Sequence, residues 1–267
     1  MIMWLAKHKI VAVLFWNVLV WIPIVLFFDA FPSTRSFWWI LYGIFMFLFS
    51  LLWADSNRIH VLQTAAKRSD ATGDPKPLSD AIEQLRPFMK SKSDKIIISI
   101  HQSFVLCNAG KFDEALLVLK ENDVDTYPGM PLAIRCNYYV NLTYIYFKLD
   151  QFDIVPFLYE KTNHLLDNLK AKPKIFNSLH FALQSTLAEY KFHQNQFDEA
   201  RALLTSFQFN DLSRNNQVNF SLLMGKILIA QNNPNDAIPY LKYVLEFGYR
   251  LYETVEAKQC LEQIGHD

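Results

Sequence analysis

A seven-residue motif recurs four times along the chain, and each copy separates two apolar stretches. The copies span residues 109–115, 149–155, 194–200 and 231–237, so they repeat at intervals of 40, 45 and 37 residues. Around each copy, apolar residues recur at three- and four-residue spacing, which is typical of amphipathic helices. Segments that repeat at such intervals stack on their neighbours as helical hairpins. The chain is therefore expected to be all-α, with each motif forming the turn of a hairpin.

The motif contains the residue types that a turn between two helices needs. Its second residue is predicted to end the first helix in the left-handed conformation, which Gly and Asn tolerate best. The fourth residue is aromatic in three copies and is expected to hold the second helix against the first. An acidic fifth residue favours the helix start, and an alanine at the seventh position lets two helices cross closely. In order, these residues are Gly110, Asp150, Asn195 and Asn232; Phe112, Phe152 and Phe197; Asp113, Asp153 and Asp198; and Ala115, Ala200 and Ala237.

These segments resemble tetratricopeptide repeats, whose turn reads Gly-x-Phe/Tyr-x-x-Ala. Ala81 precedes Ala115 by 34 residues, which is the period of that family. The resemblance covers residues 56–265 and implies an α-solenoid of about four to five helical hairpins with a solvent-facing C-terminal capping helix. A generic helical bundle is the alternative. The expected helices are 55–68, 78–90, 94–109, 112–121, 132–149, 152–169, 174–194, 197–207, 213–231, 235–247 and 249–264.

The first 53 residues differ in composition, because only Lys7, Lys9, Asp29 and Arg35 are charged there. Residues 10–28 and 37–53 carry no charge and would reach roughly 25–29 Å as helices, close to the hydrocarbon thickness of a bilayer. Two antiparallel transmembrane helices are therefore predicted. Residues 1–54 would form this hairpin and residues 55–267 the repeat domain. A cleaved signal peptide is the alternative for the first span, but its apolar run exceeds the usual length.

Basic residues near the two spans indicate their orientation. Two lysines precede the first span, whereas Arg58, Lys67 and Arg68 follow the second. The link between the spans offers only Arg35, which Asp29 offsets. Because basic residues favour the cytoplasmic side, the chain is expected to be a two-span protein of the cell membrane, with its N-terminus and C-terminal domain in the cytoplasm.

The composition argues against catalytic and nucleic-acid-binding classes. Basic and acidic residues number 26 each, so no excess of positive charge attracts a phosphate backbone. Walker-type, GxGxxG, HExxH and Gly-x-Ser-x-Gly motifs are absent from the sequence. Cys107, Cys136 and Cys260 form no CxxC pair and are expected to be reduced thiols. No enzymatic activity, cofactor, metal or nucleic-acid partner is predicted.

Tetratricopeptide arrays bind peptides in a concave groove lined by the first helix of each hairpin, and the resemblance implies such a groove here. Its amides would bond a peptide backbone, and its aromatic residues would form anchor pockets. Ile97, Ile100 and Leu222 share the groove positions but are expected to be core residues. The groove candidates are Phe104, Asn137, Asn141, Tyr144, Lys148, Ser185, Glu189, His193, Asn219 and Lys226.

The expected function is that of a membrane-tethered scaffold or adaptor that binds a protein or peptide partner in this groove. The first alternative is a structural subunit of a larger membrane complex, associated through its transmembrane helices. Asn17 in the first span could form a hydrogen bond in such an association, although a bond within the hairpin is favoured. The second alternative is an enzyme with its site in the groove, for which Glu189 and His193, one helical turn apart, are the candidate acid–base pair.

Overall fold

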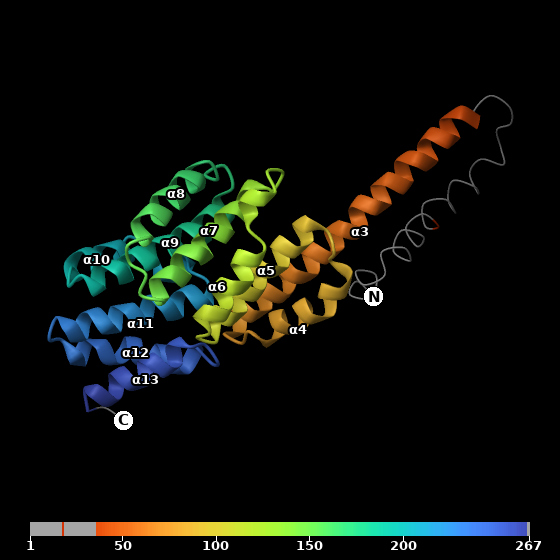
Figure 1. The fold of residues 1–267 in the computed structure, drawn as a ribbon. Helices are drawn as coiled ribbons and strands as arrows, with labels where there is room; N and C mark the ends of the chain where they lie inside the picture. Colours follow the sequence, from red (N-terminus) through yellow and green to blue (C-terminus); the bar gives the residue numbers. More distant parts are fainter. Residues whose placement is uncertain (1–17, 19–35, 266–267) are drawn as a thin grey trace. The chain divides into compact units, whose positions relative to one another are not determined.

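The computed structural model of the chain describes residue 18 and residues 36–265 (Figure 1). These residues form helices and turns, and no strand occurs among them. The predicted all-α fold is therefore confirmed. The helices are α3 (Ser36–Thr72), α4 (Lys76–Leu85), α5 (Lys92–Asn108), α6 (Phe112–Glu121), α7 (Leu132–Lys148), α8 (Val155–Asp167), α9 (Pro173–His193), α10 (Phe197–Thr205), α11 (Arg214–Ala230), α12 (Pro234–Phe247) and α13 (Glu253–Gln263).

The predicted transmembrane hairpin falls at the N-terminal edge of the described region. Apart from Val18, its first span (10–28) lies outside the described residues, and its second span (37–53) lies within α3. The helix runs unbroken from Ser36 to Thr72, so the first helix of the predicted repeat domain continues directly from this segment. Among the residues that the structure describes, no helix meets both the length and the apolarity needed to cross a membrane.

The chain divides into two compact units. Among the described residues, one unit comprises residues 36–65 together with Asp80–Met89, and the other comprises Ala66–Ser79 together with residues 90–265. The second unit contains the four motif copies. Its helices pack as successive antiparallel pairs, α5 with α6, α7 with α8, α9 with α10 and α11 with α12 (Figure 1). The first helices of neighbouring pairs also contact one another, as expected of an α-solenoid.

The motif residues adopt the conformations that the sequence predicts. The backbone φ is +72° at Gly110, +55° at Asp150, +60° at Asn195 and +60° at Asn232, all in the left-handed region. Helices α6 and α10 begin at the aromatic residue and carry the acidic residue in their first turn. The prediction is wrong for Asp153, because α8 begins only at Val155 and leaves this side chain in the preceding turn. The three alanines Ala115, Ala200 and Ala237 are fully buried where the paired helices cross.

The core of the second unit is a series of clusters, each shared by adjacent helical pairs. One cluster joins α5–α8, a second joins α7–α9, a third joins α9–α11 and the last joins α11–α13. Ile97, Ile100 and Leu222 are buried, as expected of core residues. Each pair therefore packs both within itself and against its neighbours, which is the pattern of a repeat array.

Helix α5 begins earlier than predicted, at Lys92 rather than at residue 94. Its start is a capping box, in which the Ser91 side chain accepts a hydrogen bond from the backbone of Asp94 and the Asp94 side chain accepts one from the backbone of Ser91. Such a box satisfies two backbone donors that the first turn of a helix leaves free.

The C-terminal segment has one exposed face, which includes Lys258 and Gln259, and one face that packs on the rest of the unit. Leu251, Ala257 and Leu261 are buried, and the backbone N–H of Tyr252 donates to the carbonyl of Asn108 over 2.8 Å. The Tyr252 ring also packs edge-on against Phe112, with 5.5 Å between ring centroids. Residues 249–263 are here named the closing segment. They connect the α11–α12 pair to the turn between α5 and α6. The sequence does not predict these contacts, because they join residues more than 130 positions apart.

Candidate functional site

Two hollows lie along the inner helices α5, α7, α9 and α11, and nine of the ten groove candidates line one or the other. The larger hollow, here named the cleft, has a volume of about 500 Å³ and contains Lys148, Glu189, His193 and Lys226. The smaller, here named the inner cavity, has a volume of about 90 Å³. It contains Phe104, Asn141, Tyr144, Ser185 and Asn219, whereas Asn137 on α7 lines neither hollow.

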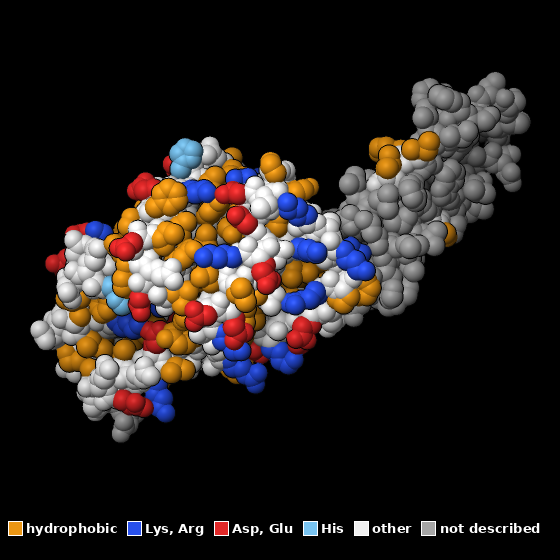
Figure 2. Space-filling view, in the orientation of Figure 1, with side chains coloured by type: hydrophobic (Ala, Val, Ile, Leu, Met, Phe, Trp, Pro, Cys, Tyr) orange, Lys and Arg blue, Asp and Glu red, His pale blue; other side chains and the backbone are white. Residues whose placement is uncertain are grey.

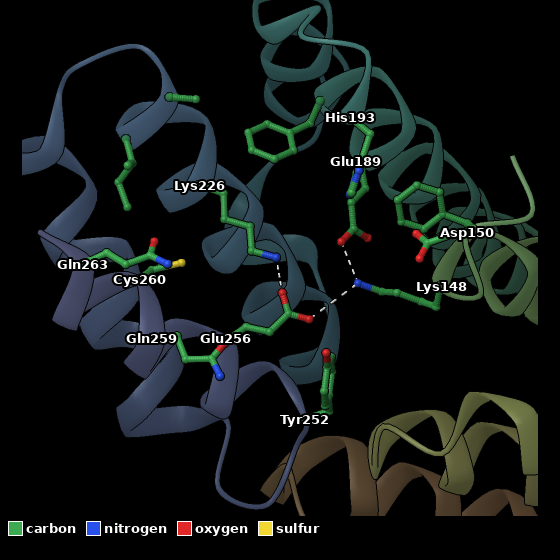
Figure 3. Close-up of a pocket in the computed structure, with 14 residues that line it drawn as sticks. Lys148, Asp150, Glu189, His193, Lys226, Tyr252, Glu256, Gln259, Cys260 and Gln263 are labelled. Atoms are coloured by element: carbon green, nitrogen blue, oxygen red, sulfur yellow. Dashed lines mark hydrogen bonds and ion pairs between the residues drawn. The ribbon is translucent and has the colours of Figure 1, made fainter.

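Four charged side chains meet in the cleft, each from a different helix (Figure 3). The ammonium of Lys148, at the end of α7, lies 2.6 Å from Oε1 of Glu189 on α9 and 3.8 Å from Oε1 of Glu256 on α13. Lys226 on α11 donates to the other oxygen of Glu256. The cations and anions thus alternate in one network, and each cation contacts at least one carboxylate.

The network is largely shielded from water, so its members shift one another's pKa. Burial alone would lower the pKa of Lys148, but Glu189 and Glu256 outweigh burial and hold it above its ordinary value. Burial would raise the pKa of Glu256, but Lys148 and Lys226 outweigh it and hold that pKa below its ordinary value. Lys148 and Glu256 therefore both remain charged at neutral pH.

Aromatic rings form the apolar part of the cleft. Phe147 and Phe192 line it beside His193, whose ring lies edge-on to Phe147 at 5.3 Å between centroids. Phe152 lies against the same histidine at 5.6 Å. Apolar walls with a few converging charges are typical of ligand and peptide sites.

Glu189 and His193, the candidate acid–base pair, each contact other side chains in the cleft. Glu189 forms its hydrogen bond with Lys148, and the His193 ring packs on phenylalanines rather than on that carboxylate. Among the described residues, no group of three or more His, Cys, Asp or Glu side chains could hold a metal ion. The three cysteines are free thiols.

One of the four charged side chains of the network, Glu256, was not among the residues predicted from the sequence. Tyr252, Glu256, Gln259, Cys260 and Gln263 line the cleft from the closing segment, which the sequence analysis had placed on the outside. The sequence contains one signal for this burial, since Ala257 and Leu261 are spaced as the apolar face of a helix. The sequence contains no signal for the contact of Glu256 with Lys148 and Lys226, which precede it by 108 and 30 residues.

Glu253 makes the stability of the closing segment dependent on pH. Burial raises the pKa of this carboxyl to about 7, and Lys148 only partly offsets the effect, while Glu256 and Glu189 add to it. Because the folded state retains the proton above the pKa of 4.5 that applies to the unfolded chain, the free energy of unfolding should fall as pH rises from about 4.5 to about 7. The expected loss is up to about 3 kcal/mol.

The measurement is urea unfolding of the full chain in mild detergent at pH 5 and pH 8. Glu253→Gln should be equally stable at both values and more stable than the wild type at pH 8. Glu256 has the opposite dependence, but its contribution is lost only in more acidic solution, because its folded-state pKa is lowered. A wild-type chain with equal stability at pH 5 and pH 8 would contradict this assignment.

In comparisons with known proteins, the chain matches no family model, no curated protein and no solved structure. The function of the cleft is therefore inferred from its geometry and from the sequence.

Proposed function

We propose that this chain is a membrane-tethered scaffold of the tetratricopeptide type, whose cleft binds a protein or peptide partner. One observation carries the proposal. The charged groups Lys148, Glu189, Lys226 and Glu256 converge with aromatic rings in a cleft of about 500 Å³, formed by three successive inner helices and the closing segment. A cleft of this size, lined by both charged and aromatic residues, suits the binding of side chains from a partner segment.

The charges suit such a partner because they are paired but not fully enclosed. The side chains of Lys226 and Lys148 are 21% and 12% exposed, so a partner reaches their edges without having to bury an isolated charge. Charge pairs of this kind contribute more to specificity than to raw affinity. The aromatic wall would supply the apolar contact that anchors a bound side chain.

Blocking the cleft should abolish partner binding without unfolding the domain. Gln259 has an exposed side chain on α13 that lines the cleft, so Gln259→Trp should fill it with an indole while removing no buried contact. The measurement is quantitative co-purification of proteins with the full chain in mild detergent. Lys258→Trp is the matched control, because Lys258 is the adjacent residue, has a 73% exposed side chain and does not line the cleft.

A protein retained by the wild type and by Lys258→Trp, but lost from Gln259→Trp, is the expected result. Equal recovery from both variants would place the binding surface elsewhere on the chain.

The proposed membrane tether rests on the uncharged segments 10–28 and 37–53. One described feature of α3 supports it, since Ile44, Phe45 and Leu48 lie within about one helical turn and are each more than half exposed. Figure 2 shows exposed hydrophobic side chains in this part of the molecule. Grouped apolar side chains exposed in this way indicate a contact with lipid or with other protein.

The tether predicts that the full chain stays with the membrane pellet after extraction with alkaline carbonate. A chain in which Ile44, Phe45 and Leu48 are replaced by lysine should be retained less completely than the wild type, since charges within a span are expensive and only the first span would remain. Release of the wild-type chain by carbonate would contradict the tether but leave the assignment of the cleft untouched.

A further inference from the structure

The inner cavity differs from the cleft in the side chains that surround it. Each of the inner helices α5, α7, α9 and α11 contributes to its wall, and Leu251 and Glu253 of the closing segment complete it. Its volume of about 90 Å³ is about three times the space that one molecule occupies in liquid water. The wall is rich in amides, contributed by Asn108, Asn141, Asn215, Asn216 and Asn219.

Several buried polar atoms in this wall have no hydrogen-bond partner in the protein. They are Nδ2 of Asn108, both Nδ2 and Oδ1 of Asn215, and Oε2 of Glu253. Asn108 as a whole is only 9% exposed. Elsewhere in the described part of the chain, Oγ of Ser221 is the only other buried side-chain atom without a hydrogen-bond partner. Since unpaired buried polar groups are costly and rare in folded proteins, four such atoms around one cavity indicate a binding site.

The four atoms also define the chemistry of the ligand. The amide nitrogens of Asn108 and Asn215 donate and Oδ1 of Asn215 accepts. Oε2 of Glu253 accepts when this carboxyl is ionised, above about pH 7, where the binding is to be measured. A cation would satisfy the two acceptors and leave the donors unpaired. An anion would satisfy the donors and would face the Glu253 carboxyl. A carboxamide offers an accepting oxygen and a donating NH₂ in one small planar group, so it complements both kinds of atom.

We propose that the inner cavity binds a carboxamide group, carried either by a free small amide or by an Asn or Gln side chain of a bound segment. The oxygen of that group accepts from the amide nitrogens of Asn108 and Asn215, and its NH₂ donates to Asn215 and Glu253. Phe104, Val140 and Leu251 enclose the apolar part of the ligand. The site is separate from the cleft, and its test with a free amide requires no partner protein.

The direct test is saturation-transfer NMR on the full chain in mild detergent with propionamide as the probe. Propionate is the control ligand, because it has the same shape and size but lacks the NH₂ donors. A site built to hydrogen-bond a group rejects the analogue that lacks it, so propionate should bind at least about tenfold more weakly.

Asn215→Leu removes two of the four atoms and keeps the same branching of the side chain. Replacing unpaired polar atoms by apolar ones of similar shape leaves stability nearly unchanged, so this variant should fold as the wild type does. Binding of propionamide should fall at least about tenfold. Glu253→Gln, which keeps the side-chain shape but replaces an accepting oxygen, should also weaken binding. Asn235→Leu is the matched control, since Asn235 is an exposed asparagine on α12.

A capped Ala-Gln-Ala peptide distinguishes the two sources of the carboxamide. Tighter binding of the peptide than of propionamide supports a side-chain pocket for a bound segment. Exclusion of the peptide with retained binding of propionamide supports a site for a free amide. Equal transfer to propionamide and propionate, or equal transfer in the wild type and Asn215→Leu, would overturn the proposal, because the polar atoms would then serve water alone.

Discussion

Lys148→Ala is expected to destabilise the repeat domain by about 3–5 kcal/mol. The ammonium of Lys148 lies between Glu189 and Glu256, whose side chains are only 8% and 14% exposed. Removing it leaves Glu189 without its cation in a poorly hydrated place. It also leaves Glu256 with Lys226 alone. An unpaired buried charge costs far more than the pair contributes, and this asymmetry explains the size of the effect.

The measurement is urea unfolding followed by far-ultraviolet circular dichroism. All six tryptophans lie within residues 1–53, so tryptophan fluorescence would not report on the repeat domain. Lys258→Ala is the control, because its ion pair with Glu262 is exposed and should contribute nothing measurable. The double variant Lys148→Ala, Glu189→Gln should recover part of the loss. If Lys148→Ala were no less stable than Lys258→Ala, the network would contribute no stability.

Gly110→Ala should destabilise the domain by about 2–4 kcal/mol, which is unusual for the addition of one methyl group. The φ of +72° at Gly110 disfavours any residue with a Cβ by about 1 kcal/mol. That Cβ would also lie 2.5 Å from Cδ2 of Tyr252 and 3.1 Å from its Cε2, so the ring must move. Overpacking of this kind costs about 1–3 kcal/mol more.

A second glycine in the chain separates these two costs. Gly265 has a φ of +70°, and a Cβ there would meet no atom within 4 Å, so Gly265→Ala should lose about 1 kcal/mol or less. The difference in free energy of unfolding between the two variants measures the contact of Tyr252 with the turn that joins α5 to α6. Equal losses would show that the closing segment does not press on Gly110, and the boundary of the cleft would then have to be redrawn.

Local features of the fold were predictable because short stretches of sequence determine them. The left-handed turns at Gly110, Asp150, Asn195 and Asn232 follow from side chains that tolerate positive φ. The helix starts at Phe112 and Phe197 follow from the acidic residues that come next in the chain and lie in the first turn of each helix. Asp153 was the exception, because the turn before α8 is longer than in the other copies and moves the helix start to Val155.

The path of the closing segment could not be predicted, because it depends on contacts between distant parts of the chain. The helical pattern of residues 249–264 fits a solvent-facing cap as well as a buried wall. Its position is decided by Leu251 and by the bond between Tyr252 and Asn108, which no local rule contains. The same limit applies to the site, where the lysines were identified as groove residues but Glu256 was missed.

The most direct test of the central claim, that the cleft is where a partner binds, is site-specific photo-crosslinking in the membrane of cells that express the full chain. A photoreactive amino acid would replace Gln259 in one version and the adjacent Lys258 in the other. We expect one adduct of defined mass from position 259 and none from position 258. No adduct at 259, or the same adducts at both positions, would contradict a partner in the cleft.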